Sequence, residues 1–528
     1  ATKRLLARQY NTLGELRSLI NAPFAANTNL DDPSVKKTTF TYDANSNQDL
    51  ATDPLGRVGD NDYDPLNRLI QSIQDKDTAA ATGEIQATVK YEYDARDNLR
   101  KVIDPKNLTT EYVYDGLNNQ TQLISPDTGT TSYTYDAAGN RLSQTDARGV
   151  VSNYAYDVLG RLTAISYPSD TTKNVGFVYD SVESVCAPEE QSATGRLSKI
   201  TDASGQTQLC YDRRGNLRRK VQTSGGQVLS VQYRYNSADR LISMTYPSGL
   251  VVDYTRDTQG RIASVNLSRN SFALTLVSGV NYLPFGPIGQ ISFPSQTLSK
   301  TWDQNYWPDA VQGSALDYDF STNEVGNITQ VASASEGTQN LGYDRLDRLN
   351  EVRDQNAALI EAFTYDATGN RLSHSVALPA GSTPTVTSYT YPGTSHRLTQ
   401  VGSAARSFDA VGNTLSGVPG FETDTASFDA RNRLTTIGTG GSAQQRANYN
   451  GRGERVLASS GAPAPALPSA SGDWATGGIT GTLYDESGQV ISKLVSGSAL
   501  RFEEIVWIDN TPVGRVLSST TEAQEVYA

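Results

Sequence analysis

A Tyr-Asp pair recurs along this chain at a constant interval, and this repeat limits the possible folds more than any other feature. In the clearest stretch each pair lies 21 residues after the one before: Tyr93-Asp94, Tyr114-Asp115, Tyr135-Asp136 and Tyr156-Asp157. The further pairs are Tyr42-Asp43, Tyr63-Asp64, Tyr179-Asp180, Tyr211-Asp212, Tyr343-Asp344, Tyr365-Asp366 and Tyr484-Asp485. A short period that is kept over most of a chain predicts one continuous structure rather than a string of separate domains.

The best-preserved repeat, YTYDAAGNRLSQTDARG, begins at Tyr133 and reads as two strands and two turns. Tyr133 and Tyr135 are two residues apart, so their side chains share one face of a strand. Asp136 can accept hydrogen bonds from the backbone N–H groups that follow it, and Gly139-Asn140 tolerates the positive φ that a tight turn needs. Arg141 then begins the return strand. Successive repeats of this kind predict a continuous antiparallel ribbon.

Composition favours a ribbon that is wound around a space rather than packed into a solid core. Hydrophobic residues make up 37% of the chain, and both strand faces carry Ser, Thr and Gln. Such a ribbon can seal neighbouring turns to one another but has too few apolar side chains to fill a large interior. We therefore expect an all-β fold, a long antiparallel β-ribbon of ~21-residue repeats wound into a hollow shell. Helix should be confined to short pieces, and the first 20 residues suit either a helix or a degenerate repeat.

Breaks in the repeat predict how the chain is divided. The expected segments are a lead-in or degenerate repeat (1–40), a first part of the shell (41–267), a non-repeat insert (268–318), a second part of the shell (319–458), a Pro/Ala/Ser/Gly-rich loop (459–478) and terminal shell repeats (479–528). The insert contains Trp302 and Trp307 and is apolar enough to be packed, whereas the composition of the loop is typical of a mobile strap.

Charge argues against two classes of partner. The chain has 45 basic and 57 acidic residues, a net charge of −12, and its pI is near 4.9. A basic nucleic-acid footprint and a polybasic membrane surface are therefore not expected. No apolar run approaches the ~18 residues of a spanning helix, so we expect no membrane span.

The Tyr-Asp pairs suit a structural role or sugar binding, because aromatic faces beside carboxylates also suit carbohydrate. The structural role is favoured, since Tyr fits a half-buried strand, Asp begins a turn, and a binding site would not recur evenly along the chain. Arginines that follow the turns should pair with turn aspartates or stack on tyrosines, with a ligand-binding ladder as the alternative. These arginines are Arg141, Arg161, Arg261, Arg348 and Arg371. The residues expected to carry the structural motif are Tyr93, Asp94, Tyr114, Asp115, Tyr135, Asp136, Gly139, Asn140, Arg141, Tyr156, Asp157, Gly160, Arg161, Tyr365, Asp366, Gly369, Asn370 and Arg371.

The sequence predicts no metal site. Asp60, Asp62 and Asp64 have the alternating spacing of a calcium loop, but Pro65 and Gln71 stand where that loop requires Gly and Glu. A repeat turn accounts for these residues better.

No catalytic constellation is predicted either. His374 and His396 are one repeat apart, which is not a metal-ligand spacing on one helix, and no G-x-S-x-G elbow is present. Glu189-Glu190, or any two turn aspartates, could form a glycosidase pair in principle, but the sequence selects none of them. Cys186 and Cys210 could form a disulfide between adjacent ribbon turns or remain two buried thiols.

The pattern Y-x-Y-D-x-x-G-N-R-L, which recurs in more than ten copies between about Tyr42 and Pro512, resembles the RHS/YD-repeat family. This family includes bacterial Rhs polymorphic toxins, the C subunits of insecticidal Tc toxins, wall-associated repeat proteins and teneurins. YLPFGPIG, from Tyr282, resembles a non-repeat insert of Rhs cores. EEIVWIDNTPVGRV, from Glu503, resembles a stretch shortly before the family's closing region.

The resemblance implies a hollow β-shell, or cocoon, that encloses a polypeptide. In Rhs and Tc toxins the cargo is a variable C-terminal toxin that is released by self-cleavage. The aspartyl self-cleavage motif ending in Asp-Pro-x-Gly-Leu and a toxin domain are not found before Ala528. We therefore expect a chain that ends before the closing region, and we assign it no enzyme activity and no cofactor.

The expected function is a structural container that encapsulates a C-terminal toxin or effector for delivery to competitor or host cells. The expected partners are the enclosed polypeptide, either the protein's own C-terminal region or a separate chain, and a secretion-spike or adaptor protein. The protein would be secreted or delivered by a bacterial system, with type VI secretion and intercellular competition as the expected setting. The alternative is an extracellular cell-surface protein for adhesion or carbohydrate binding, as the wall-associated and teneurin relatives imply.

Overall fold

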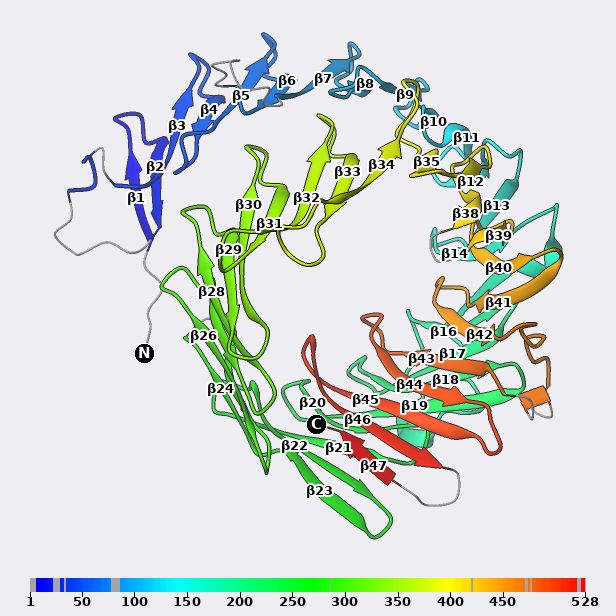
Figure 1. Ribbon diagram of the computed structural model, residues 1–528. Helices are drawn as coiled ribbons and strands as arrows, with labels where there is room; N and C mark the ends of the chain where they lie inside the picture. Colours follow the sequence, from blue (N-terminus) through cyan, green and yellow to red (C-terminus); the bar gives the residue numbers. More distant parts are fainter. Residues whose placement is uncertain are drawn as a thin grey trace. The chain divides into compact units, whose positions relative to one another are not determined.

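The structure, a computed structural model, describes residues 6–21, 29–32, 35–76, 86–284, 286–418, 421–470, 473–474, 477–519 and 524–527. Antiparallel strands form nearly all of its regular structure, and they pair with their neighbours along the chain (Figure 1). These residues contain no α-helix, and their helical structure is confined to short 3-10 turns such as Thr171–Lys173 and Pro188–Glu190. The predicted all-β fold built from a long antiparallel ribbon is confirmed.

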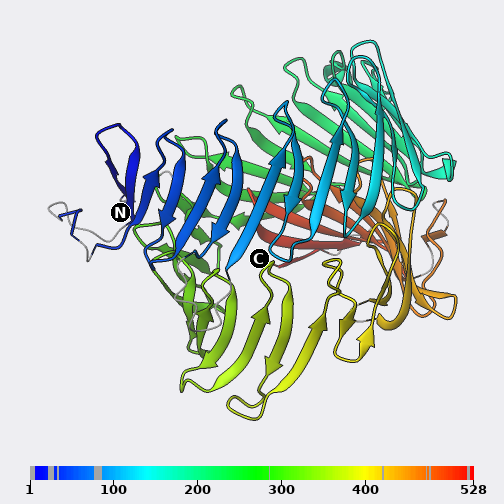
Figure 2. The same cartoon turned by 90° about the horizontal axis from the view of Figure 1, so that it is seen from above.

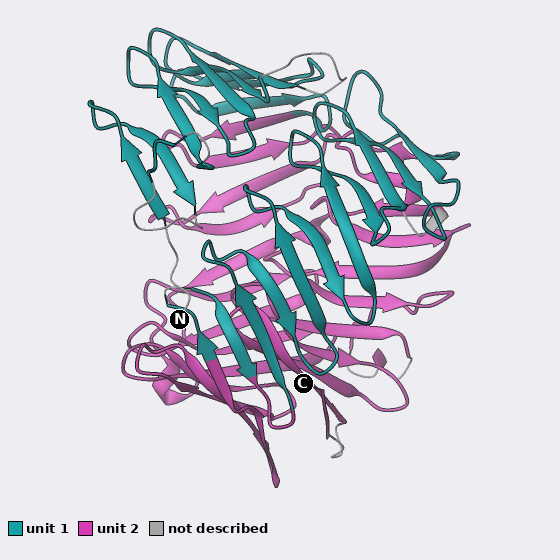
Figure 3. Ribbon diagram, turned by 60° about the vertical axis from the view of Figure 1, so that its left-hand side comes forward, with its two compact units in different colours: residues 1–130, 281–291, 296–405 teal, residues 131–280, 292–295, 406–528 magenta. Residues whose placement is uncertain are grey.

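The chain divides into two compact units, which are coloured separately in Figure 3. Unit 1 comprises residues 1–130, 281–291 and 296–405, and unit 2 comprises residues 131–280, 292–295 and 406–528. This division does not test the segment bounds expected from the sequence, which stay a prediction.

The strands that lie mainly in unit 1 fall into two series. The first series is β1 Leu6–Tyr10, β2 Leu16–Asn21, β3 Thr38–Tyr42, β4 Gln48–Thr52, β5 Val58–Tyr63, β6 Leu69–Gln74, β7 Ala87–Tyr93, β8 Leu99–Ile103, β9 Thr109–Tyr114 and β10 Gln120–Ser125. The second series is β25 Ile288–Ser292, β26 Thr297–Trp302, β27 Pro308–Gln312, β28 Asp317–Thr322, β29 Ile328–Ser333, β30 Gly337–Tyr343, β31 Leu349–Asp354, β32 Leu359–Tyr365, β33 Arg371–Val376, β34 Thr385–Thr390, β35 Gln400–Val401 and β36 Ala404–Ala405. Figure 2 shows β3 to β10 side by side as one row of strands.

Unit 2 is likewise built from two series, and β24 (Gly279–Tyr282) lies at the boundary of the units. The first series is β11 Gly129–Tyr135, β12 Arg141–Thr145, β13 Val151–Tyr156, β14 Leu162–Ser166, β15 Val175–Tyr179, β16 Leu197–Asp202, β17 Gly205–Tyr211, β18 Leu217–Ser224, β19 Gln227–Tyr235, β20 Leu241–Thr245, β21 Val251–Arg256, β22 Ile262–Arg269 and β23 Phe272–Val277. The second series is β37 Ser407–Phe408, β38 Thr414–Val418, β39 Phe421–Phe428, β40 Leu434–Thr439, β41 Ser442–Tyr449, β42 Arg455–Ser460, β43 Ile479–Tyr484, β44 Val490–Val495, β45 Arg501–Ile508, β46 Thr511–Ser519 and β47 Gln524–Tyr527.

The beginning of the chain is a hairpin, so the alternative of an N-terminal helix is wrong for the described residues. Strands β1 and β2 pair antiparallel, with Ala7 opposite Ile20. Asn11 closes the turn between them by accepting hydrogen bonds from the backbone N–H groups of Leu13 and Glu15. The hairpin matches the second alternative for the first 20 residues, a degenerate repeat. Residues 1–5, 22–28 and 33–34 of the predicted lead-in lie outside the described residues.

The repeat hairpins share a shift of register at the last residue of the first strand. The pairing shifts between Thr134 and Tyr135, between Thr364 and Tyr365, and likewise at the equivalent tyrosines of other hairpins. A β-bulge of this kind increases the local twist and re-aims the side chain next to it. The second Tyr of the motif therefore occupies a special backbone position just before the turn.

The two ribbon series of unit 2 pack against each other through side chains and make an apolar core. Tyr246 Oη donates to Ile505 O over 3.0 Å, and Trp474 Nε1 donates to Gly225 O over 2.8 Å. The core includes Val231, Val265, Leu267, Leu483, Ile491, Val506 and Val516, all at most 1% exposed. A solid core of this size was not expected from the composition.

Unit 1 is built differently. Of the 39 hydrophobic residues that are buried among those the structure describes, five lie in unit 1: Ile20, Ala87, Ile291, Ala310 and Ala377. Most residues of its strands are partly exposed on both faces; in β8 and β10, for example, no residue is buried. The described strands of unit 1 therefore resemble β12, β13 and β14 of unit 2, which also have no buried residue, and differ from the strands of unit 2 that form its apolar core.

Candidate functional site

The turn after each Tyr-Asp pair is organised by the carboxylate of its aspartate. Asp136 Oδ1 accepts hydrogen bonds from the backbone N–H groups of Ala138 (2.9 Å) and Asn140 (2.8 Å), and Oδ2 accepts one from Asn140 Nδ2 (2.9 Å). Gly139 adopts a φ of 84°, a conformation that costs glycine little. The hydrogen bonds from the Asn140 side chain and backbone lower the pKa of Asp136. The same arrangement is built by Asp94, Asp115, Asp157 and Asp366.

The residue before the end of the turn can link consecutive turns through its side chain, in addition to links made by arginines such as Arg348, whose Nη1 donates to Asp366 O over 2.6 Å. Where it is Asn or Asp with positive φ, as at Asn67, Asp97 and Asn118, its side chain accepts a hydrogen bond from the preceding turn. Asn98 Nδ2, for example, donates to Asn118 Oδ1 over 3.0 Å. Where it is Gly, as at Gly139, Gly160 and Gly369, no side chain is available for this bond. Gly at this position makes the turn easier to form, whereas Asn or Asp adds a side-chain hydrogen bond to the preceding turn.

The second Tyr of the motif reaches back by one repeat. Tyr156 Oη donates to Arg141 O over 3.0 Å, and Tyr365 Oη donates to Leu349 O over 2.8 Å. Burial raises the pKa of both phenols. Each such bond ties one hairpin to the strand that precedes it in the ribbon.

Other side chains with a terminal N–H replace this Tyr and keep its bond. Trp302 Nε1 donates to Ile288 O over 3.2 Å, and Trp507 Nε1 donates to Val490 O over 3.0 Å. Arg256 stands at this position before Asp257, and its Nε donates to Leu241 O over 3.1 Å. The position therefore accepts several long side chains that end in a donor, although Phe408 and Phe428, whose rings carry no donor, hold it before Asp409 and Asp429.

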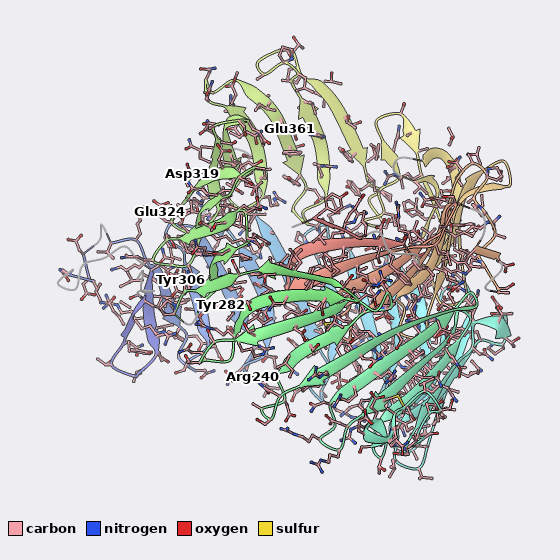
Figure 4. The ribbon with its side chains drawn as sticks, turned by 90° about the horizontal axis from the view of Figure 1, so that it is seen from below. Arg240, Tyr282, Tyr306, Asp319, Glu324 and Glu361 are labelled. Atoms are coloured by element: carbon pink, nitrogen blue, oxygen red, sulfur yellow. A yellow bond between two sulfur atoms is a disulfide. The ribbon has the colours of Figure 1, made fainter. Side chains whose placement is uncertain are left out.

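The same geometry extends into the predicted insert, residues 268–318. Asp303 Oδ1 accepts from the backbone N–H of Trp307 over 2.9 Å, as a turn aspartate does. Tyr306 has a φ of 63°, and its Oη donates to Pro284 O over 2.6 Å. Figure 4 labels Tyr306 and Tyr282, which lie on neighbouring hairpins. The predicted break at this segment is therefore not visible in its turn hydrogen bonds.

The arginines make both contacts that the sequence predicts for them. Arg161, Arg261 and Arg348 pair with Asp157, Asp257 and Asp344 at 2.7–2.8 Å. The guanidinium of Arg141 lies 4.5 Å from the ring centre of Tyr133, and that of Arg371 lies 4.4 Å from Tyr389. Arg161 and Arg348 also stack on Tyr179 and Tyr365 of the next repeat. These contacts leave the arginines engaged within the ribbon itself.

Cys186 and Cys210 form a disulfide, with an S–S distance of 2.08 Å. It joins the long segment between β15 and β16 to strand β17 within unit 2. Of the two alternatives that the sequence left open, the structure contains the disulfide. Glu190 of the same segment is buried and pairs with Arg219 over 2.8 Å, so it is held as an ion pair.

The three aspartates with calcium-like spacing each have a different partner within the protein. Asp60 pairs with Lys76 over 2.5 Å, Asp62 accepts from Gln71, and Asp64 caps its own turn. Across the described ranges, no group of three His, Cys, Asp or Glu side chains is placed to hold a metal ion.

A seam of turn residues joins the two ribbon series of unit 1, and sequence reasoning missed it. Arg57 pairs with Asp347 over 2.7 Å, and Arg345 pairs with Asp75 over 2.5 Å. His396 contributes to the same seam, because its Nε2 lies 2.5 Å from Asp104 Oδ2. The partners are 270 to 292 residues apart in the chain, so no local pattern marks them.

The two histidines are not brought together. His374 contacts Glu361 (3.0 Å; Glu361 is labelled in Figure 4) and stacks on Phe363. His396 Nδ1 lies 3.0 Å from Asn370 Nδ2 at a cavity of about 400 Å³, whose lining also includes Tyr91 and Thr368. His374 thus makes its contacts within its own hairpin, whereas His396 makes its contacts across the seam of unit 1.

The family model described as RHS Repeat matches residues 93–131, 125–151, 135–172, 211–251 and 235–269. These stretches contain the best-preserved Tyr-Asp turns. The chain therefore carries RHS repeats in residues 93–172 and 211–269. No curated protein matches the chain.

Solved structures share the fold of this RHS-repeat chain over almost its whole length. In TcdB2-TccC3 solved without the hypervariable C-terminal region, the TM-score is 0.77 at 14% identity, with 97% of this chain covered. A Tc holotoxin pore from Photorhabdus luminescens with a mutated TccC3 gives a TM-score of 0.67 at 15% identity, with 98% covered. The RHS-repeat chain spans only 28% and 27% of the lengths of these chains. At sequence identities this low, the structural match establishes a common fold and nothing more.

Proposed function

We propose that this RHS-repeat chain is part of a container that encloses a toxin or effector polypeptide. The observation that carries the proposal is the match of nearly the whole chain to TccC3-containing structures, together with repeat turns that use their polar groups internally. One of those relatives has a hypervariable C-terminal region, and another is part of a holotoxin pore. A scaffold of this kind can stay constant while the polypeptide attached to it varies.

The two modes of packing support a container. The strands of unit 1 are joined along a polar seam and leave both faces partly exposed. Unit 2 has a buried core of its own. An unlayered sheet with Ser, Thr, Gln and Tyr on its faces can contact an unfolded chain weakly at many points instead of binding one ligand tightly. The contacts would then confine the cargo without selecting its sequence.

The enclosed polypeptide and a secretion-spike or adaptor protein are the proposed partners, and delivery by a bacterial secretion system, including type VI secretion in competition between cells, is the proposed setting. No helix in the described ranges is long and apolar enough to cross a membrane. The container itself needs no chemistry, and we assign it no catalytic role. Adhesion or carbohydrate binding at a cell surface is the second proposal; the aromatic and carboxylate groups of the turns are its only support.

Protection of a cargo from protease tests the container. A polypeptide that is disordered on its own would be fused after residue 528, and the same polypeptide would be fused before residue 1 of a second protein as a matched control. We expect the first cargo to resist protease until the β-structure is unfolded, because a confined chain is not accessible to the enzyme. Digestion of both cargos at the rate of the free polypeptide would contradict the proposal, whereas specific binding on a glycan array would favour the adhesin.

A further inference from the structure

Glu504 is a carboxyl group that is buried in unit 2 without a counter-ion. It lies on β45 and is 0% exposed. Its oxygens accept two hydrogen bonds from one residue of the other ribbon series: Ser248 N donates to Oε1 over 2.9 Å and Ser248 Oγ donates to Oε2 over 2.7 Å. Within the part of the chain that the structure describes, it takes part in no ion pair. Other buried carboxylates of the chain, such as Asp60, Asp75 and Glu190, do have such a partner.

The groups around Glu504 supply little compensating charge. Ser492 of β44 and Val516 of β46 are its neighbours on the same sheet. From the opposite series, Arg269 of β22 is near enough to favour the charged form, but its Nη1 is buried without a hydrogen-bond partner. Tyr246, at the end of β20, is the remaining titratable group that senses Glu504. Most of the free-energy cost of moving an ionised carboxylate from water to this place is therefore not offset.

The hydrogen bonds around Glu504 can survive the addition of a proton. Ser248 Oγ already accepts from Leu250 N over 3.2 Å, so it is oriented by its own turn. If Oε2 carries a proton, it can donate to Ser248 Oγ in place of accepting from it, while Ser248 N continues to donate to Oε1. The contact is therefore kept in both states, and only the neutral state avoids burying a charge.

We propose that Glu504 and Ser248 form a pH-dependent clasp between the two ribbon series of unit 2, one that tightens when Glu504 takes up a proton. Burial raises the pKa of Glu504 to about 7 from its ordinary value of 4.5, with the Ser248 hydrogen bonds opposing that shift. A group whose pKa is raised on folding binds more protons in the folded state, so the folded state gains stability as the pH falls through this range. The gain is complete below pH 4.5 and is lost as the pH rises through about 7.

The clasp predicts a direction opposite to that of the turn aspartates. Their pKa values are lowered by their hydrogen bonds, so their contribution is lost only in stronger acid, below about pH 4. Between pH 8 and pH 5 the clasp should therefore act alone among these carboxyl groups. If the full difference between the two pKa values of Glu504 is realised, the opening equilibrium of this region changes by about 70-fold over that interval.

Amide hydrogen exchange at pH 5–8, corrected for the intrinsic rate, tests the clasp on the intact chain. We expect peptides that cover 246–250 and β45 to gain about 70-fold in protection from pH 8 to pH 5, and Glu504→Gln to abolish this dependence. Glu503→Gln is the matched control, because Glu503 is the adjacent residue, pairs with Arg515 over 3.0 Å and lies on the other face of β45. The control should keep the pH dependence of the natural chain.

A second measurement covers the case in which Glu504→Gln does not fold. The carboxyl carbon of Glu504 can be followed by 13C NMR in the natural chain, where we expect it to titrate near neutral pH. A titration below pH 5, or equal pH dependence of exchange in the natural chain and Glu504→Gln, would overturn the clasp.

Discussion

Removal of one turn carboxylate should loosen its hairpin by an amount that the structure allows to be estimated. Asp366 accepts four hydrogen bonds: from Thr368 N (3.0 Å), Asn370 N (2.9 Å), Thr368 Oγ1 (2.8 Å) and Asn370 Nδ2 (2.9 Å). In Asp366→Ala the two side-chain donors can turn to water, but the two backbone N–H groups lose a charged acceptor. At about 1.5 kcal/mol for each of these two bonds, the local free energy of opening should fall by about 3 kcal/mol.

Hydrogen exchange of peptides that cover β32 and β33 measures this loss directly. A change of about 3 kcal/mol corresponds to exchange that is roughly 100-fold faster. Asp366→Asn keeps an acceptor for the backbone N–H groups and should show a smaller change. Asp62→Ala is the matched control, because Asp62 makes one exposed hydrogen bond, to Gln71, within a strand. Natural exchange in Asp366→Ala, or an equal effect in Asp62→Ala, would refute the role given to the turn carboxylate.

Gly139→Val should cost about 1–3 kcal/mol of stability, because Gly139 has a φ of 84°; an unchanged melting temperature would mean that the turn tolerates a branched side chain. Tyr365→Phe should lower the free energy of unfolding by about 1 kcal/mol, because the hydrogen bond to Leu349 O is lost. Tyr135→Ala should lower it by ~3 kcal/mol or more, because the packing of the ring is lost. Chemical denaturation measures both, and equal effects would show that the hydroxyl, not the ring, dominates. Reduction of Cys186–Cys210, which closes a separation of 24 residues, should speed hydrogen exchange in residues 181–196 while β32–β33 exchange as before, and no change in residues 181–196 would show that the segment is held without the disulfide. Acid should weaken the turn of Asp366. Burial raises the pKa of Asp366, but hydrogen bonds from Asn370 and Thr368 outweigh burial and leave the pKa lowered, so the stabilisation present above about pH 4 should be lost as the pH falls further. Circular dichroism that stays constant to pH 2 would contradict this prediction.

The sequence predicted the ribbon because the features that build it are local. The Asp136 carboxylate, the positive φ of Gly139 and the stacking of Arg141 on Tyr133 all lie within one repeat. Hydrogen bonds over two to four residues leave a fixed spacing in the sequence, and that spacing can be recognised without a structure. The pairing of each hairpin with the next follows from the same spacing.

The sequence could not predict the contacts between distant parts of each unit. Ser248 and Glu504 are 256 residues apart, and Arg57 and Asp347 are 290 residues apart, so neither pair leaves a local pattern. The composition also hid the core of unit 2, because its apolar residues are averaged with the polar strands of unit 1. Arg256 was missed as well, since its role depends on a donor at the end of the side chain and not on an aromatic ring.

Small-angle X-ray scattering of the purified chain tests the container most directly. Compact packing of 528 residues predicts a radius of gyration of ~24 Å. A ribbon wound around a wet cavity wide enough for a polypeptide should give a clearly larger value, with the pair-distance distribution of a hollow particle. A radius at the compact limit, with the distribution of a solid particle, would contradict the container.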